Sequence, residues 1–377
     1  MVNILSFIFL GLLIFYFLFI RKIRIGITSL GYYNTQIQDN EFISIIIPFR
    51  NEEDKILDNL KSVENQNYPN DKYEVIYIDD FSDDDSFQKL RNNISAENIS
   101  VYSMQASNLE MAHKKQAIEF GISKSKGSLI LFTDADCIVS PNWISSMVVR
   151  FEDNTGLISG PVSFFESNNL FSKLQRLEFA GLILSGAGLI GNKTPMIASS
   201  ANLAFRKSVF DEVGGYNNLM NLSSGDDELL MQKIAYSTDY EVKFCLNKEA
   251  LVYTNPNKNI EEFAQQRKRW ASKGLFYENK LIIAQLLLIF LFYIGLIVQL
   301  FLGLFFDAKF IILFAGSFFV KILVEYSVLE KGLGILIEKI SLPQFLLAEI
   351  LHIPYIIYSA ISGALGNFTW KDRELKR

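Results

Sequence analysis

The sequence predicts an α/β domain with a mainly parallel sheet, flanked by hydrophobic helices long enough to cross a membrane. Apolar, β-branched runs alternate with helical patterns through the middle of the 377-residue chain, and both ends are apolar. Hydrophobic residues make up 50% of the chain, a high share for a wholly soluble protein. The net charge of -5 gives no electrostatic footprint for nucleic acid, so we expect no nucleic-acid partner.

The amino-terminal segment, residues 1–24, is predicted to be an uncleaved transmembrane anchor. Val2 to Ile20 is an apolar run without charges, about as long as the ~20 residues that one crossing needs. Three basic residues follow it at once: Arg21, Lys22 and Arg24. A signal peptide has the reverse arrangement, with positive charge before the apolar run. By the positive-inside rule the following domain is cytoplasmic, in an integral protein of the cell (inner) membrane.

The carboxyl-terminal third, residues 280–367, is predicted to be a second membrane region. Leu281 to Phe306 carries no charge, whereas Phe310 to Leu329 contains Lys321 and Glu325. Four residues apart, these two charges could pair on one helix face, or they could lie near an interface and reach toward water. Charges inside a membrane segment are functional candidates.

The last apolar segment, Phe345 to Leu365, contains Pro354, which predicts a kinked or re-entrant element. Four crossings from an outside amino terminus would leave the basic tail, residues 368–377, outside, against the positive-inside rule. Either the last segment does not cross, or residues 332–340 contribute to the membrane region. The number of crossings stays open at this point.

The middle of the chain, residues 40–275, carries a repeated strand and helix pattern. Apolar runs typical of strands occupy 42–49, 73–80, 98–102 and 129–132. Helical patterns follow at 51–66, where Asn51 is the expected cap, and at 111–127, which ends at a glycine. This alternation is typical of a parallel sheet covered by helices.

Three acidic loops follow three of these strands: "PFRNEED", "DDFSDDDS" and "DADC". In an open α/β sheet, ligands bind at the carboxyl ends of the strands, so we expect the loops to converge on one crevice. Carboxylates alone would repel a phosphorylated ligand. The pattern therefore indicates a divalent cation between carboxylate and phosphate, or facing basic residues. Mg²⁺ and Mn²⁺ prefer carboxylate oxygens, and one of them is the expected cofactor.

Six motifs appear in an order and spacing that resemble the membrane-bound glycosyltransferases of family 2. They are "SIIIPFRNEED", "VIYIDDFSDDDS", "KKQAIEFG", "FTDAD", "SGDDELL" and "QQRKRW". The resemblance covers about residues 42 to 270. It implies a GT-A fold, a nucleotide-diphosphate sugar as donor and a divalent metal, and the flanking membrane segments suit the same group.

The resemblance implies a set of residues for the nucleotide sugar: Pro48, Arg50, Glu52, Asp79, Asp80, Lys114 and Asp134. Asp79 or Asp80 would bind the base or ribose, and Lys114 a phosphate. Asp136 is the predicted metal ligand; with a side-chain period of two, it would point the same way as Asp134. For the acids of "DDFSDDDS" the alternative is an Asp/Ser turn that caps a helix. For Lys114 the alternative is an exposed helix lysine.

By the same resemblance, the paired acids Asp226 and Asp227 are the catalytic candidates. Asp227 is the expected general base, which takes the proton from the acceptor hydroxyl as that oxygen attacks the anomeric carbon. A single displacement of this kind inverts the anomeric centre. The alternative is that both acids only stabilise the start of a helix through its dipole.

The "QQRKRW" motif implies a wall over the diphosphate and the acceptor, built from Gln266, Arg267, Arg269 and Trp270. A basic helix with a tryptophan at the membrane surface is the alternative, and the two are compatible. Asn202 lies where family members approach the acceptor.

The resulting prediction is an inverting glycosyltransferase that moves a sugar, from a UDP-sugar, to a membrane lipid or a lipid-linked or growing glycan. The alternatives are a processive polysaccharide synthase of the same family and a non-catalytic, nucleotide-sugar-binding membrane scaffold. A P-loop phosphotransferase is disfavoured, because the sequence has no G-x-x-x-x-G-K-[ST] motif. The identity of the sugar, the acceptor and the oligomeric state stay open.

Overall fold

A seven-stranded sheet with the order β3-β2-β1-β4-β8-β6-β9 forms the centre of the α/β region. The computed structural model describes residues 2–31, 41–104, 113–220, 222, 224–277, 279–365, 368–370 and 373–375. The strands are β1 (Ile43–Phe49), β2 (Tyr73–Asp79), β3 (Ile99–Ser103), β4 (Leu129–Phe132), β6 (Thr155–Ser159), β8 (Leu203–Arg206) and β9 (Glu241–Phe244).

The first four strands of this sheet pair in parallel, as do β6 and β9, and β8 runs antiparallel to both of its neighbours. The predicted mainly parallel sheet is therefore confirmed. All residues of β1 and β4 are buried, which explains their continuous apolar sequences.

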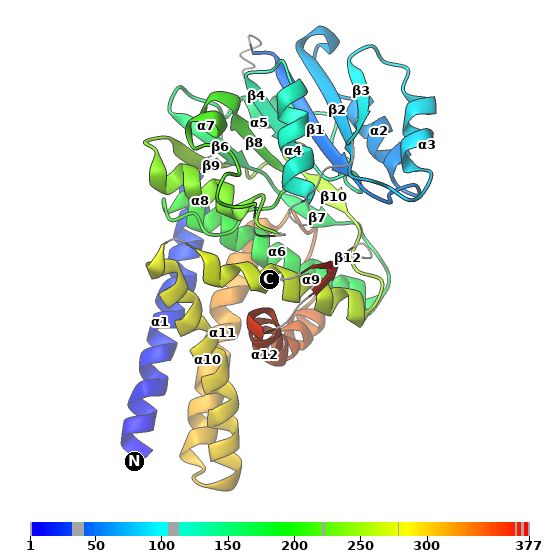
Figure 1. The fold of residues 1–377 in the computed structure, drawn as a ribbon. Helices are drawn as coiled ribbons and strands as arrows, with labels where there is room; N and C mark the ends of the chain where they lie inside the picture. Colours follow the sequence, from blue (N-terminus) through cyan, green and yellow to red (C-terminus); the bar gives the residue numbers. More distant parts are fainter. Residues whose placement is uncertain are drawn as a thin grey trace.

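Helices cover this sheet, and a smaller sheet lies beside it (Figure 1). The covering helices are α2 (Ile56–Glu64), α3 (Ser86–Asn93), α4 (His113–Lys124), α5 (Trp143–Val148), α7 (Lys207–Glu212) and α8 (Glu228–Ser237). The second sheet has the order β5-β10-β7, from β5 (Ile138–Val139), β10 (Val252–Thr254) and β7 (Val162–Phe164). Short 3-10 helices occupy Asn70–Lys72, Lys248–Ala250, Lys273–Phe276 and Glu330–Gly332.

The prediction that Asn51 caps the first helix is wrong. Helix α2 begins at Ile56, five residues later, and its cap position is Lys55. Asn51 instead adopts a left-handed backbone with φ of 51°, and its side-chain oxygen accepts a hydrogen bond from the Asp83 backbone at 2.8 Å. Asparagine tolerates this conformation better than most residues, so Asn51 joins two acidic loops rather than starting a helix.

Two helices lie between the α/β region and the long hydrophobic helices: α6 (Leu170–Gly191) and α9 (Ile260–Ser272). Helix α1 (Val2–Ser29) packs closely on α6. A Cβ atom at Gly188 would lie 2.3 Å from the backbone oxygen of Ile23, and one at Gly26 would lie 1.9 Å from that of Gly188. The small residues of α6 therefore allow the backbones of the two helices to touch.

Four of the described helices are long and apolar enough to cross a membrane. They are α1, α10 (Lys280–Phe305), α11 (Lys309–Leu329) and α12 (Leu342–Leu365). In Figure 1, α1, α10 and α11 extend together away from the α/β region, whereas α12 lies crosswise beneath α9 and is seen nearly end-on. Pro354 lies inside a continuous helix. The tail forms a hairpin of β11 (Phe368–Trp370) and β12 (Arg373–Leu375), and β11 contacts α9.

The charges in α11 form an internal ion cluster. Lys321 is 0% exposed and lies 2.9 Å from Glu325 on its own helix, and it also pairs with Glu349 of α12. Tyr16 of α1 donates a hydrogen bond to Glu325, and Tyr293 of α10 lies 3.4 Å from the same carboxylate. The cluster thus joins four helices, and Lys321 does not extend to an interface.

Candidate active site

One cavity of about 1550 Å³ runs from the carboxyl ends of the parallel strands to the long hydrophobic helices. The part next to the strand ends, called the upper part below, is lined by polar residues that follow β1 and β4 or lie on α4, α8 and α9. Its lower part is lined by apolar residues of two helices: Ile283, Leu286, Leu287, Ile289 and Phe290 of α10, and Ile356, Ala360, Ile361, Ala364 and Leu365 of α12. The cavity exceeds the ~300–1,000 Å³ of a typical small-molecule site, which leaves room for two substrates.

At the end near the strands, four of the residues predicted for the nucleotide sugar line the cavity: Pro48, Arg50, Glu52 and Asp80. Arg50 donates to the backbone oxygens of Asp80, at 3.1 Å, and Phe81, and it pairs with Asp83 at 2.6 Å. The guanidinium therefore fixes the loop that carries Asp80.

The structure separates the two candidate acids after β2. The carboxylate of Asp79 accepts hydrogen bonds from the Ser82 backbone, at 3.0 Å, and the Ser103 hydroxyl, at 3.2 Å, and the residue is 5% exposed. Those bonds direct the Asp79 side chain into the turn and toward β3, so of the two candidates Asp79 has the structural role. Asp80 is the acid that reaches the cavity.

Lys114 of α4 connects two of the predicted acidic motifs. Its ammonium lies 2.7 Å from Asp134, 3.1 Å from Asp226 and 2.9 Å from the Ser200 hydroxyl. Burial would lower the pKa of Lys114, but the two carboxylates outweigh it and raise that pKa. Burial also raises the pKa of Asp226, yet the nearby lysines, Lys114 first, bring it down to about 2. The charged forms of both groups are therefore favoured.

Asp136 lies in the same cavity, 3.7 Å from the Lys55 ammonium and 3.3 Å from the Thr254 hydroxyl. Ligand atoms of Asp134, Asp136 and Cys137 all lie within 4.8 Å of one another. Burial raises the pKa of the Cys137 thiol well above its usual value, so the thiol stays neutral. The two carboxylates alone match the needs of Mg²⁺ or Mn²⁺, which take few protein ligands and complete their shell with water and phosphate.

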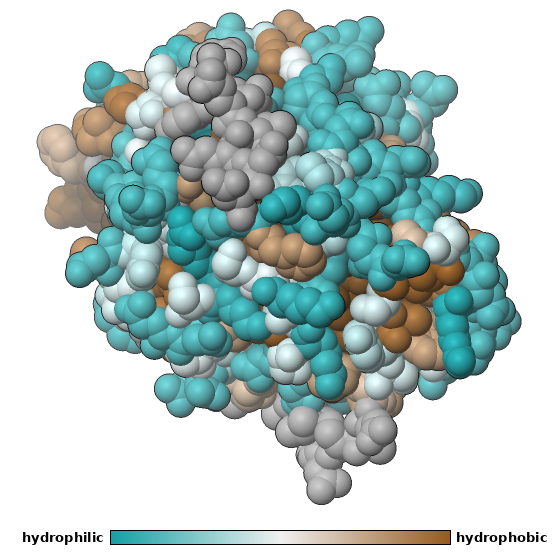
Figure 2. Space-filling model, turned by 90° about the horizontal axis from the view of Figure 1, so that it is seen from above, coloured by the Kyte–Doolittle hydropathy of each residue, from teal (hydrophilic) through white to brown (hydrophobic). Residues whose placement is uncertain are grey.

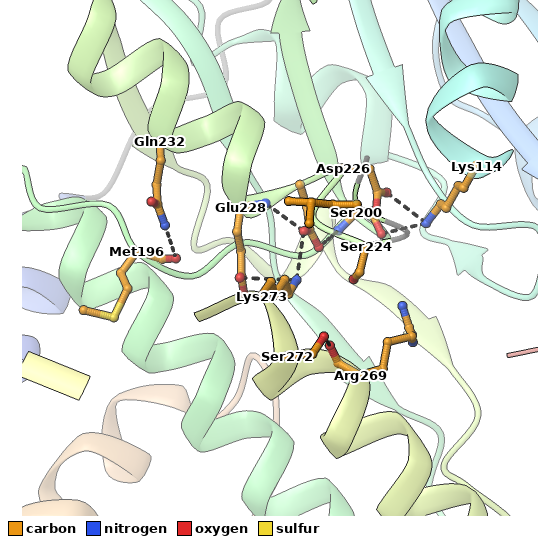
Figure 3. A network of polar contacts seen from close by, with 12 residues as sticks. Lys114, Met196, Ser200, Ser224, Asp226, Glu228, Gln232, Arg269, Ser272 and Lys273 are labelled. Carbon is orange, nitrogen blue, oxygen red and sulfur yellow. Dashed lines mark hydrogen bonds and ion pairs between the residues drawn. The ribbon is translucent and has the colours of Figure 1, made fainter. Parts of the chain in front are cut away.

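Asp227 is more constrained than Asp226. As the cap of α8, it accepts from the Glu228 backbone at 2.7 Å, and it also accepts from the Ser200 backbone at 3.1 Å and from Lys273 at 3.2 Å. Figure 3 shows this network, with Lys114 approaching Asp226 from one side and Lys273 approaching Glu228 from the other.

Glu228 and Lys273 are site residues that the sequence reasoning missed. Glu228 accepts from the Tyr277 hydroxyl at 2.7 Å and lies 3.2 Å from Lys273. Burial raises the pKa of Glu228 to about 7, although Lys273 opposes the rise. Lys273 follows Trp270 by three residues and so lies about one helical turn beyond it, which is the one signal in the sequence that could have indicated it.

The four predicted residues of α9 line the cavity: Gln266, Arg267, Arg269 and Trp270. Arg267, however, is 3% exposed and directs its guanidinium at Glu178 and Gln266 rather than toward the acidic loops. Arg267 thus contributes to the predicted wall through its place in the cavity lining, while its charge is paired with Glu178. In Figure 3, Arg269 extends from α9 toward the side of Asp226 and Lys114.

The expectation that Asn202 approaches the acceptor is wrong. Asn202 is 0% exposed, and its amide donates to the backbone oxygens of Pro161 and Ala250 at 2.8 and 2.7 Å. Its carbonyl accepts from the Trp143 indole at 2.9 Å. The side chain therefore joins the segments of Trp143, Pro161 and Ala250.

Comparisons with known proteins agree on one family. Residues 44–214 match the model of Glycosyl transferase family 2. Glycosyltransferase AglE of Haloferax volcanii is 29% identical over 194 residues, which cover 49% of this chain and 59% of that protein. Poly-beta-1,6-N-acetyl-D-glucosamine synthase of Staphylococcus epidermidis is 24% identical over 250 residues, which cover 63% and 55%. The chain thus spans somewhat more than half the length of these relatives.

A solved structure shares the fold over nearly the whole chain. The mannosyltransferase PcManGT from Pyrobaculum calidifontis, in complex with GDP-Man and Mn2+, superposes with a TM-score of 0.58. The match covers 96% of this chain and 97% of that one, at 15% sequence identity. The likeness confirms the predicted GT-A arrangement of the α/β region.

Proposed function

We propose that the chain, whose residues 44–214 match the model of Glycosyl transferase family 2, transfers a sugar from a nucleotide-diphosphate sugar to a lipid acceptor in the membrane. One observation carries the proposal: a single cavity joins the acidic strand ends to an apolar passage between α10 and α12. The first part suits a charged donor, and the second suits a hydrocarbon chain.

The upper part of the cavity would bind the donor, for which we favour a UDP-sugar. Asp80 offers a carboxylate to base or ribose hydrogen bonds, and Lys114 and Arg269 bring positive charge for the diphosphate. Asp136, with Asp134, would hold Mg²⁺ or Mn²⁺. When bound, the ion supplies positive charge where the departing diphosphate becomes more negative.

Asp226 is the proton acceptor that the geometry favours. The three hydrogen bonds to Asp227 occupy its carboxylate, whereas the partner of Asp226 is an ammonium that a donor phosphate could draw away. The acceptor hydroxyl would give its proton to Asp226 while its oxygen bonds to the anomeric carbon. The bond from that carbon to the diphosphate breaks, the electron pair leaves with the diphosphate, and the configuration inverts. Asp227 would connect the loop of Ser200 to the start of α8.

The apolar passage favours a lipid over a growing polysaccharide. The side chains that α10 and α12 present there are isoleucine, leucine, alanine and phenylalanine, with Ser359 and Tyr355 as the polar exceptions. A polymer of sugars needs hydrogen-bond partners along its path, and these residues offer few. The processive synthase is therefore the second candidate.

The arrangement of α12 also supports a membrane topology. We propose that α1, α10 and α11 cross the membrane and that α12 lies along its surface, on the side of the α/β region. The catalytic domain (40–275) would then share the cytoplasmic side with Arg21, Lys22, Arg24 and the basic tail, as the positive-inside rule requires. The mostly hydrophilic face that points away from the long helices, seen in Figure 2, agrees with a position outside the lipid.

The test is the release of free nucleoside diphosphate from a panel of UDP- and GDP-sugars by the full chain in native-lipid nanodiscs with Mn²⁺. We expect one donor to turn over, and Asp136→Asn and Asp226→Asn to abolish the release. Asp58→Asn, on the exposed face of α2, is the matched control and should behave like the wild type. Asp227→Asn should retain more activity than Asp226→Asn; the reverse order would return the base role to Asp227.

The products separate the remaining candidates. Mass spectrometry of the nanodisc lipids should show one added sugar per acceptor. Long polymer from the purified enzyme would contradict the lipid acceptor and support the processive synthase. Metal-dependent binding of UDP without turnover of any donor, in membranes that contain the native lipids, would support the scaffold instead.

A further inference from the structure

We propose that Glu178 of α6 is a positioning residue that fastens the catalytic helix α9 to the membrane helix α12. In this arrangement the seating of α12 sets the orientation of the α9 side chains that line the cavity. The inference deepens the proposed function, on which its activity measurements rest.

Glu178 lies at the meeting point of three helices. Its carboxylate accepts from the Nε of Arg267 at 3.2 Å, and a second bond runs from the Nη2 of the same arginine. The Tyr355 hydroxyl of α12 donates to the same Oε1 atom as the Arg267 Nε, at 2.7 Å. The Glu178 side chain is 15% exposed, so water offers little replacement for either partner.

Aromatic rings enclose the guanidinium of Arg267. Its central carbon lies 4.4 Å from the ring centre of Phe263 and 4.2 Å from that of Trp270. The Trp270 ring stacks on Phe179 of α6 at 5.9 Å. A buried charge of this kind needs its counterion, because removing one partner leaves the other unpaired. The pair of Glu178 and Arg267 therefore fixes the rotation of α9.

Helix α12 is itself fixed at two points on either side of Tyr355. Toward its start, Glu349 pairs with Lys321, and His352 lies 3.5 Å from Glu325 of α11. Toward its end, a Cβ atom at Gly363 would lie 2.7 Å from the Cβ of Ala271, so α12 touches α9 almost backbone to backbone. The Tyr355 hydroxyl is thus presented to Glu178 by a helix that cannot easily turn.

The consequence for the site follows from the spacing on α9. Gln266 precedes Arg267 directly, and Trp270 lies three residues after it; both line the cavity. A small rotation of α9 would displace both from the acceptor. In contrast, the donor contacts at Asp80, Asp134 and Asp136 belong to other elements and should keep their positions.

Two conservative variants and a matched control test this. Tyr355→Phe removes one hydroxyl, and Glu178→Gln removes the charge. The control Tyr358→Phe removes the same hydroxyl from the same helix, at a residue that is 54% exposed. The readouts are kcat, the KM for the donor and the hydrogen–deuterium exchange of residues 260–272, all in nanodiscs.

We expect Tyr355→Phe, which removes one hydrogen bond to the carboxylate, to lower kcat about 3- to 10-fold, and Glu178→Gln, which removes the charge that Arg267 and Tyr355 share, about 10- to 100-fold. The donor KM should change less than kcat, because the donor contacts at Asp80, Asp134 and Asp136 lie on other elements and only Arg269 is carried by α9. Exchange at 260–272 should increase in both variants and not in Tyr358→Phe. The double variant should be no slower than Glu178→Gln alone, because both changes break one connection.

The proposal is overturned if Tyr355→Phe matches Tyr358→Phe in kcat and in exchange, or if the two effects multiply in the double variant. A change in donor KM of the same size as that in kcat would indicate general loosening rather than positioning. If the wild type transfers no sugar, the proposed function fails, yet the exchange measurement still decides whether Glu178 fastens α9 to α12.

Discussion

Two lysines in this molecule each lie between two carboxylates, but their surroundings differ. Lys114 lies between Asp134 and Asp226, at 2.7 and 3.1 Å. Lys321 lies between Glu325, at 2.9 Å, and Glu349. The first group lines the cavity, and the Asp134 side chain is 30% exposed. The second is enclosed by four helices, with the lysine 0% exposed.

The difference teaches that access, rather than charge pattern, separates a ligand site from a structural cluster. A lysine that borders a cavity can exchange a carboxylate for a phosphate when a ligand arrives. A lysine sealed between helices has no such exchange, and its pairing specifies how the helices fit together. Ion pairs of this kind are better attested as devices of register than as sources of net stability.

The largest effect is expected when Lys321 is replaced. Lys321→Met leaves two buried carboxylates without their counterion, which should destabilise the fold by about 3–5 kcal/mol. The measurement is thermal unfolding in nanodiscs. Lys309→Met, at an exposed residue of the same helix, is the control and should unfold like the wild type. An unchanged melting temperature in Lys321→Met would mean that the cluster does not hold the helices.

The next effect is expected at Lys114, in activity rather than in stability. Lys114→Met should lower kcat by about 10²–10³-fold, the usual loss when a positioned donor to developing charge is removed. Its melting temperature should fall less than that of Lys321→Met, because the carboxylates it leaves border a cavity that water can enter. Lys124→Met, at the exposed end of α4, is the control. If Lys114→Met keeps a third of the wild-type kcat, Lys114 does not act on the ligand, and the proposed difference between Lys114 and Lys321 is wrong.

The residues of the proposed donor end could be placed together from the sequence because that information is local. Apolar runs and their ends place Asp80, Asp134 and Asp136 at the edge of a parallel sheet without any knowledge of distant contacts. Lys114 and the acids at 226 and 227 came from motif resemblance, and the structure brings them to the same cavity.

The acceptor side was harder to predict because it depends on contacts between distant segments. Arg267 turns toward Glu178, 89 residues earlier in the chain, and Asn202 turns into the core toward Trp143. Neither partner has a spacing that a sequence pattern could reveal. Asn51 failed for another reason, since a good helix cap is also a good residue for a left-handed turn.

The smallest of the three effects concerns Glu228, a buried acid that pairs with Lys273. It appears only as a pH dependence of the thermal stability. Burial raises the pKa of Glu228 in the folded chain from 4.5 to about 7. The folded state therefore binds this proton more tightly than the unfolded state does, so its contribution to stability is lost as pH rises from about 4.5 through 7. The shift corresponds to about 3 kcal/mol at most. The glutamine of Glu228→Gln cannot ionise, so this variant does not lose that contribution as the pH rises. The melting temperature of Glu228→Gln minus that of the wild type should therefore be higher at pH 8 than at pH 5. The exposed control Glu97→Gln should show the same pH dependence of melting temperature as the wild type. If the melting temperature changes equally with pH in all three proteins, Lys273 already compensates the charge of Glu228 in the folded site.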